Sequence, residues 1–470
     1  VAVVIASMAG GDDDETAASI SVETDDESSV STVEPEPTAG DDSRDVPTAD
    51  VPAATPAPAA FTDCDAFVSI DAAPDGDGSF ERPFVDFDDG VDVLEPGKML
   101  CVLPGRYIDP FVITDAGTEE KPITIRGFNG TSVLSIKILA RDVVVEDFEV
   151  TGLTRKEGPG ILLAGERITV RNNLVHEMAG VGIACQRALA GKSPRCVDSE
   201  ISGNRIWDID GYGIFVWGDG NRVHDNQIWK IYAGIHEDAD AIRFFGSNHD
   251  FRYNYIHDIF EDDATPGRTP KSDCFQTYDT EGKHPPLENI VIAQNVCSTD
   301  RHGVILNRLH GAPAQNIVIE NNVFHSDGVA AVLLFGDETG PEVQYRGLQI
   351  GNNLFTGDVA FDGIQASFGT DVDIVNNLFM GQFDQFTVEA AADVAESNNL
   401  IVTEDDFVDV TNPDFRERYR LAPGSVAIDA AADEFAPAVD LMDVARPVDG
   451  SGDGNAVADV GPYEYVPASP

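Results

Sequence analysis

Five polar residues occupy matching positions in three neighbouring sequence repeats, and their types are those of acid–base chemistry. Asp240 and Asp273 each precede a small residue and an apolar run, Arg243 and Gln276 follow them three residues later, and His302 takes the aspartate position in the next repeat. If the repeats stack in parallel, equivalent side chains lie about 4.8 Å apart. Two carboxylates at that distance repel, so one pKa should be raised unless Arg243 or a bound cation separates them. Such a pair can hold calcium, or act as the acid and nucleophile of a retaining glycosidase.

The surrounding sequence supplies candidates for the remaining roles. In a β-elimination at a uronic acid, Arg243 or calcium would neutralise the sugar carboxylate, and Lys283, Arg308 or His302 would remove the proton. Tyr278 or His302 would protonate the leaving oxygen. The alternative is that the aspartates cap turns and His302 is an ordinary surface residue. Four residues are expected to bind the sugar: Trp217, Phe245, His236 and Asn307.

These positions are set by a repeat that is centred on an asparagine. An apolar-alternating run precedes each asparagine, and the steps between repeats range from 22 to 41 residues. This pattern predicts a β-solenoid in which each repeat is one coil. The asparagine tolerates left-handed backbone and can hydrogen-bond the main chain in a tight bend, so stacked coils place one above another. The repeated asparagines are Asn173, Asn204, Asn226, Asn254, Asn295, Asn322, Asn353, Asn377 and Asn399.

Large apolar residues follow each asparagine, and we expect them to fill the interior. They are Leu174, Ile206, Ile228, Tyr255, Val296, Val323, Leu354, Leu378 and Leu400.

A second strand is expected in each interval, where a small residue, a branched or aromatic residue, a variable residue and an apolar residue follow in that order. Examples are GIFVW at Gly213, AIRFF at Ala241 and CFQTY at Cys274. The sequence therefore predicts an all-β fold, a single-stranded right-handed parallel β-helix of roughly ten coils.

The charge of the chain excludes some classes of partner. The formal net charge is −53, and about −40 remains when the first 60 residues are left out. Such a protein repels nucleic acid phosphates and acidic membrane surfaces. The expected partner is a polysaccharide, and the expected oligomeric state is a monomer.

Six cysteines suit three disulfides, which indicate an oxidising, secreted or cell-surface setting. Six cysteines permit fifteen connectivities. Their positions favour Cys64–Cys101, Cys185–Cys196 and Cys274–Cys297. No cysteine or histidine spacing suggests zinc, and no organic cofactor is expected.

The chain divides into four predicted regions. Residues 1–11 look like the end of a secretory signal, because an apolar run is followed by small residues. The run is too short for a transmembrane helix, which needs about 20 apolar residues. Residues 12–60 are rich in Asp, Glu, Ser, Thr, Pro and Ala, which predicts a disordered acidic spacer. The β-helix is expected over 61–411 and a C-terminal capping segment over 412–470.

The first coils carry two further motifs, VLEPGKMLCVLPGRY and GTEEKPITIRG. Together with FVSIDAAPDGDG before them, they resemble the opening of secreted β-helix polysaccharide lyases of the chondroitinase B and alginate lyase type. The resemblance covers 67–130 and implies the pectate lyase-like β-helix fold. The Asp75-Gly76-Asp77-Gly78 stretch has the composition of a calcium loop, but a turn is the preferred interpretation.

The end of the chain has its own resemblance. RYRLAPGSVAIDAA and the DLMDVARPVDG run after it resemble a terminal segment of bacterial surface β-helix proteins, over 412–465. This segment is expected to cap the open end of the solenoid. Asp449 and Asp453 have the alternate spacing of a calcium loop, so a structural calcium ion is a further expectation.

The lyase resemblance also touches the candidate site. The chondroitinase B type carries a catalytic Lys and, about one coil later, an Arg in an RHG run. This chain has Arg301-His302-Gly303 and also Arg308-Leu309-His310-Gly311, with Lys271 or Lys283 before them. The lysines lack the motif that surrounds the family's lysine, and the family's calcium-binding glutamates have no counterpart.

Three functions follow as hypotheses. The favoured one is a secreted, carbohydrate-active lyase that cleaves a uronic-acid-containing polysaccharide by β-elimination. The second is a glycoside hydrolase that uses Asp240 and Asp273, and the third is a glycan-binding surface solenoid without catalysis.

Overall fold

A computed structural model describes most of the chain after residue 62. The described residues are 63–152, 158–186, 196–232, 239–259, 272–279, 282–307, 312–327, 330–335, 343–357, 362–381, 384–389 and 391–468. Residues 55–470 form one compact unit. The predicted signal remnant and acidic spacer lie outside the described residues.

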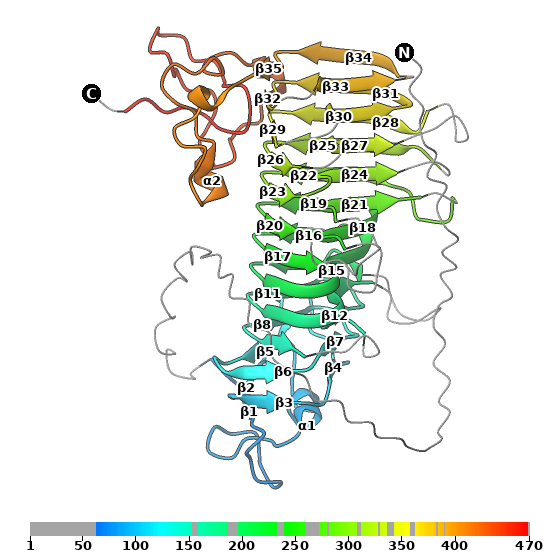
Figure 1. Ribbon diagram of the computed structural model, residues 1–470. Helices are drawn as coiled ribbons and strands as arrows, with labels where there is room; N and C mark the ends of the chain where they lie inside the picture. Colours follow the sequence, from blue (N-terminus) through cyan, green and yellow to red (C-terminus); the bar gives the residue numbers. More distant parts are fainter. Residues whose placement is uncertain are drawn as a thin grey trace, which may run out of the picture. The chain divides into compact units, whose positions relative to one another are not determined.

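The described unit is a pile of coils, each built from parallel strands that pair with the equivalent strands of the coils before and after (Figure 1). The strand before each asparagine belongs to a 13-stranded sheet, here called the pre-Asn sheet. Its strands are β1 (Ala66–Val68), β2 (Met99–Val102), β5 (Ile123–Gly127), β8 (Val143–Glu146), β11 (Ile168–Arg171), β14 (Glu200–Ser202), β16 (Arg222–His224), β19 (Asp250–Arg252), β22 (Glu288–Ala293), β25 (Ala314–Glu320), β28 (Tyr345–Gly351), β31 (Gly369–Val375) and β34 (Ala392–Ser397).

A short strand follows each asparagine and forms the post-Asn ladder. The sequence predicted two strands per coil, so this strand is a correction: apart from β12 and β15 it has only two to six residues, too few to show a clear alternating pattern. The ladder comprises β3 (Gly105–Tyr107), β6 (Thr131–Val133), β9 (Glu149–Thr151), β12 (Leu174–Cys185), β15 (Arg205–Asp219), β17 (Gln227–Tyr232), β20 (Tyr255–Ile259), β23 (Val296–Thr299), β26 (Val323–Ser326), β29 (Leu354–Thr356), β32 (Leu378–Met380) and β35 (Leu400–Ile401).

The predicted second strand forms a third ladder. The long strands β12 and β15 belong to both of these ladders and join them into one 22-stranded sheet, which also includes β13 (Cys196–Val197). The other strands of the third ladder are β4 (Phe111–Ile113), β7 (Ile136–Ile138), β10 (Ile161–Leu163), β18 (Ile242–Ser247), β21 (Phe275–Tyr278), β24 (Val304–Asn307), β27 (Ala330–Phe335), β30 (Asp362–Ser367) and β33 (Asp384–Glu389).

The nine asparagines form the predicted ladder. Each one from Asn173 to Asn377 donates its Nδ2–H to the Oδ1 of the next, at 3.0 or 3.1 Å. The same Oδ1 accepts a backbone N–H of the coil before, as in Asn254 N to Asn295 Oδ1 at 2.9 Å. The left-handed backbone lies one residue earlier than expected, for example at Tyr253 with φ of 55°. The ladder asparagines therefore act through their amides.

The residues after the asparagine do not all face the interior. Ile206 and Ile228, two positions after it, are fully buried in the central core, as predicted. The residue one position after it points outward, which makes the prediction wrong for the other seven. These outward residues pair in one column that runs from Leu174 through Arg205 and Gln227 to Tyr255 and onward to Leu400.

A C-terminal segment, residues 402–468, covers the later part of this column. It contains the short helices η2 (Glu404–Asp406), α2 (Phe415–Arg418) and η3 (Asp433–Phe435). Its Phe407, Tyr419 and Tyr463 pack in one cluster with Val323 and Leu354 of the column. Figure 1 shows the segment beside β26, β29 and β32.

The segment therefore covers the flank of the coils, not their open end as predicted. Polar contacts fix it there: Gln294 donates to the Asp440 carbonyl oxygen at 3.0 Å, and Asn376 Nδ2 donates to the Ala432 carbonyl oxygen at 3.1 Å. The outward apolar column provides the reason, because it needs cover and the segment supplies it.

All three predicted disulfides are present: Cys64–Cys101, Cys185–Cys196 and Cys274–Cys297. At the first coils, helix α1 (Phe87–Asp92) places Phe87 against Phe111, with ring centroids 3.8 Å apart. In the part of the chain that is described, no helix has the length and apolar character needed to cross a membrane.

Candidate active site

The five polar residues lie on neighbouring layers of the third ladder, in the register that their spacing predicts. Arg243 pairs with Gln276 and Gln276 pairs with Ile305 across β18, β21 and β24. The residues just before these strands are aligned in the same way: the backbone N–H of Ala241, which follows Asp240, donates to the Asp273 carbonyl oxygen at 2.9 Å. The Cys274 N–H likewise donates to the His302 carbonyl oxygen at 3.0 Å. The sequence thus placed Asp240, Asp273 and His302 correctly in one column.

Arg243 is fixed by two partners. Its Nε–H donates to Asp240 Oδ2 at 2.7 Å, and its Nη1–H donates to the Tyr212 hydroxyl at 2.6 Å. The guanidinium carbon also lies 4.2 Å from the Tyr212 ring centroid and 5.5 Å from that of Tyr278. Arg243 is 4% exposed and Asp240 is fully buried. Arg243 is thus a buried cation held between tyrosines of the two neighbouring coils.

Tyr212 was not predicted as a site residue. It stands in the same column as Asp240, but its repeat is otherwise apolar around it. Its position one coil before the aspartate was the signal that could have identified it.

His302 and Asp273 form a buried pair. His302 Nδ1 lies 2.8 Å from Asp273 Oδ1, and Gln276 Nε2–H donates to Asp273 Oδ2 at 3.0 Å. Burial works to raise the pKa of the Asp273 carboxyl. The contact with His302, followed by the charge of Arg301 and the Gln276 hydrogen bond, outweighs burial and lowers that pKa. Asp273 is therefore an ionised acceptor, and we infer that His302 Nδ1 carries the proton that it accepts.

Among the residues that the structure describes, two atoms beside this pair have no hydrogen-bond partner. They are His302 Nε2 and Gln276 Oε1, both buried, on residues that are 2% and 6% exposed. Asn307 Oδ1, on the next strand β24, is in the same state. Buried polar atoms are almost always paired, so three such atoms on one face point to a ligand.

The aspartate pair does not suit calcium or retaining hydrolysis. All four carboxylate oxygens accept protein donors: Arg243 and the Asp273 N–H at Asp240, and His302 and Gln276 at Asp273. A calcium ion needs oxygens that are open to it. A glycosidase acid needs a raised pKa, but that of Asp273 is lowered. Neither role fits this arrangement.

In the expected calcium loop near the C-terminus, the aspartate oxygens also accept hydrogen bonds from the protein. Both oxygens of Asp449 accept backbone N–H groups, from Gly452 at 2.7 Å and Gly454 at 2.8 Å. Asp453 Oδ1 accepts the Asn455 N–H at 2.8 Å. In the described ranges, no three His, Cys, Asp or Glu side chains form a group that could hold a metal ion. These aspartates close turns.

The predicted sugar-stacking residues have different fates. Phe245 is 2% exposed because His284 stacks on it, with ring centroids 4.6 Å apart and an interplanar angle of 15°. Phe245 therefore offers no free face, and its predicted stacking role is wrong. Trp217 and Tyr278 are half-buried and flank it at 4.9 and 5.1 Å. His284, which sequence reasoning missed, lies in a loop whose conformation the repeat does not determine.

The remaining candidates are scattered or undescribed. Lys283 is exposed, and its backbone N–H donates to Asp279 Oδ1 at 3.0 Å. Asn307 lies beside Tyr278 in the register of β21 and β24. His236, Lys271, Arg308 and His310, with most of the long insertion after Asp258, lie outside the described residues.

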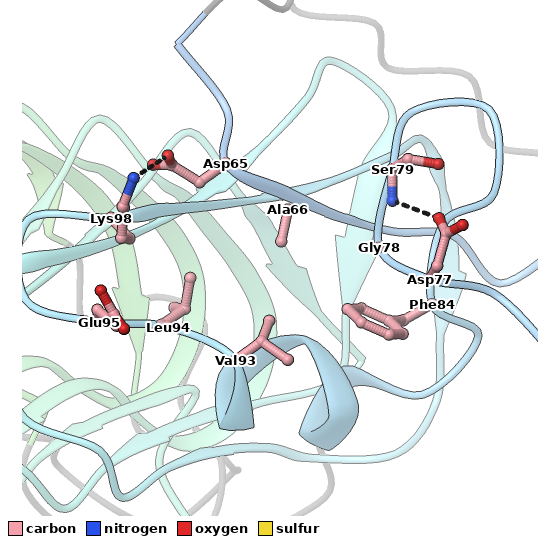
Figure 2. A pocket seen from close by; sticks show the side chains of 10 residues that line it. All are labelled: Asp65, Ala66, Asp77, Gly78, Ser79, Phe84, Val93, Leu94, Glu95 and Lys98. Atoms are coloured by element: carbon pink, nitrogen blue, oxygen red, sulfur yellow. Dashed lines mark hydrogen bonds and ion pairs between the residues drawn. The ribbon is translucent and has the colours of Figure 1, made fainter.

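A separate cavity of about 430 Å³ lies at the first coils, next to α1 (Figure 2). Lys98 and Asp65 form an ion pair at 2.8 Å on its wall, and Asp77 accepts the Ser79 N–H at 3.0 Å. The preferred interpretation of the Asp75–Gly78 stretch as a turn is in keeping with this bond. The cavity contains none of the predicted site residues.

Comparisons with known proteins define the class of fold. A family model described as "Right handed beta helix region" matches residues 198–379. Pectate lyase Pel9A has a similar structure, with 15% identity and a TM-score of 0.50, over 85% of this chain and 96% of that one. The complex of XylC with xylose gives 10% identity and a TM-score of 0.52, over 85% and 98%. No curated protein sequence matches the chain.

The fold is therefore a right-handed parallel β-helix, as predicted. At these identities the similarity establishes the fold alone, so function must be argued from the site.

Proposed function

We propose that this protein cleaves a uronic-acid-containing polysaccharide by β-elimination on the outer face of β15, β18, β21 and β24. The observation that carries the proposal is the buried, unpartnered Nε2 of His302, whose Nδ1 lies 2.8 Å from Asp273. An imidazole oriented in this way presents its lone pair as a general base. Asp273 orients the ring and Gln276 fixes Asp273.

In the proposed reaction, His302 Nε2 removes the proton from C5 of the uronate. The electron pair forms the C4–C5 double bond, and the bond between C4 and the glycosidic oxygen breaks. Arg243, held by Asp240, stabilises the negative charge that develops on the uronate carboxylate. Tyr278 or Tyr212, whose rings lie beside Arg243, gives a proton to the leaving oxygen.

The mechanism requires that the sugar reach His302, which is 2% exposed. Burial also favours it, because charges act more strongly where water is excluded. The similar structures include a pectate lyase, and three disulfides fit an oxidising, extracellular setting.

The test is an incubation with polygalacturonate, alginate and neutral xylan, followed by two readings. A lyase raises both the absorbance of unsaturated uronide products and the number of reducing ends. A hydrolase raises only the reducing ends, and a glycan-binding protein raises neither. Either of the last two results contradicts the proposal. So does unchanged activity in His302→Gln.

A further inference from the structure

The Gln276 amide has a fixed orientation. Its Nε2–H donates to Asp273 Oδ2 at 3.0 Å, and an ionised carboxylate can only accept. The amide therefore cannot turn over without placing its oxygen against the carboxylate. Its Oε1 must face the other way, where it is buried and has no partner in the described part of the chain.

The neighbouring unpartnered atoms are hydrogen-bond acceptors, as Gln276 Oε1 is. Asn307 Oδ1 is an acceptor, and His302 Nε2 is an acceptor when Nδ1 carries the proton. Gln276 pairs with Ile305, and Asn307 follows two residues later on the same face of β24. Strand spacing puts such positions about 5 Å apart across the ladder and about 7 Å apart along it. One sugar ring spans that range.

Three acceptors need a ligand that supplies donors. The donors of a glycan are its hydroxyl groups, whereas O-acyl groups donate nothing and add bulk at a buried position. From this we infer that Gln276 is a specificity-determining residue that accepts a hydrogen bond from a free sugar hydroxyl, so that the site rejects glycans acylated at that hydroxyl. The inference rests on the proposed function in taking the ligand to be a glycan.

The cost of acylation follows from the burial of Gln276. A buried acceptor left without a donor weakens binding, and a site built to hydrogen-bond a hydroxyl discriminates strongly against a substrate that lacks it. We expect O-acetylation to weaken binding by about tenfold or more.

The experiment measures binding of two polymer pairs: polygalacturonate and xylan, each unmodified and partly O-acetylated. All proteins carry His302→Gln, so that no polymer is cleaved during the measurement. Gln276→Met removes the acceptor and keeps the length of the side chain. Gln365→Met is the control, because Gln365 lies in the same column, three coils further on. Thermal unfolding of each variant shows whether it is folded.

The parent is expected to bind an unmodified polymer about tenfold or more tightly than its acetylated form. Gln276→Met should lose most of that preference, and Gln365→Met should keep it. Equal binding of both forms by the parent overturns the inference, as do binding of neither pair and an unchanged preference in folded Gln276→Met. If Gln276→Met does not fold, the preference of the parent alone decides. A preference seen only with xylan supports the inference but contradicts the uronate substrate of the proposed function.

Discussion

The asparagine ladder and the outer face of the third ladder both bury polar side chains in columns, but they differ in saturation. Asn295 donates to Asn322 Oδ1 and to two carbonyl oxygens, while its own Oδ1 accepts two N–H groups of Asn254. On the outer face, Gln276 and His302 each leave one polar atom unpaired. Saturated columns stabilise the coils, and the unpaired atoms of the outer face are where we propose that a ligand binds.

Two histidines show the same contrast. His249 Nδ1 accepts the Asn221 N–H at 3.3 Å, and its Nε2 lies 3.2 Å from the Phe245 carbonyl oxygen, so both ring nitrogens are paired. Burial lowers the pKa of His249 to about 4. His302 has one paired nitrogen and one open nitrogen. The first ring is a structural part of a turn, and the second is the base of the proposed reaction.

Replacing the open histidine should have the largest effect. His302→Gln keeps a polar side chain but removes the base, and general-base catalysis contributes about 10²–10⁴-fold to rates. We expect a loss of about 10³-fold in the formation of unsaturated products, with little change in thermal unfolding. Asp273→Asn should also lower the rate, because it no longer holds the ring proton on Nδ1. A normal rate in either variant contradicts the role of the pair.

Breaking the saturated column should affect stability instead. Asn295→Ala leaves the Asn254 N–H and several carbonyl oxygens without partners, which should cost about 3 kcal/mol of unfolding free energy. Asn316→Gly is the control: Asn316 belongs to an exposed asparagine row, and glycine tolerates its φ of 54°. Denaturant unfolding measures both. Equal losses would show that burial of the ladder does not matter.

The paired histidine predicts a dependence of stability on pH. The folded state holds the His249 pKa near 4, while the unfolded chain titrates near 6.5. Below 6.5 the unfolded state binds a proton that the folded state does not, so stability falls as the pH drops from 6.5 towards 4. The total is roughly 3 kcal/mol. His249→Gln should flatten this part of the profile of unfolding free energy against pH, and an unchanged slope would contradict the assignment.

Substitutions in the outward column beside the C-terminal segment should have the smallest effect on stability, and Leu354 and Leu174 provide a matched pair. Leu354 is buried beneath the C-terminal segment, whereas Leu174 stands in the same column and is 37% exposed. Leu354→Ala should cost about 2 kcal/mol and speed proteolysis of the segment. Leu174→Ala should change stability by less than about 0.5 kcal/mol. Similar values for both would mean that the segment does not depend on this column.

The sequence was sufficient to predict the features whose positions the repeat determines. Stacking of the asparagines, the column of Asp240, Asp273 and His302, and the three disulfides follow from spacing, because each coil copies the path of the one before. The strand after each asparagine was missed, since most of these strands are too short to show an alternating pattern. The burial of Leu354 on the flank depends on a segment that begins about 50 residues later. The burial of Phe245 depends on His284, in a loop whose conformation the repeat does not specify.

The most direct test of the account is nuclear magnetic resonance of the protein with ¹⁵N-labelled histidine, with and without uronate oligosaccharides. Spectra of His302→Gln and His249→Gln assign the two rings. The account predicts that His302 carries its proton on Nδ1 and that its Nε2 resonance shifts when oligogalacturonate or oligomannuronate is added, while the His249 signals stay in place. A His302 Nε2 signal that neither oligosaccharide changes would contradict the claim that this open nitrogen faces the ligand.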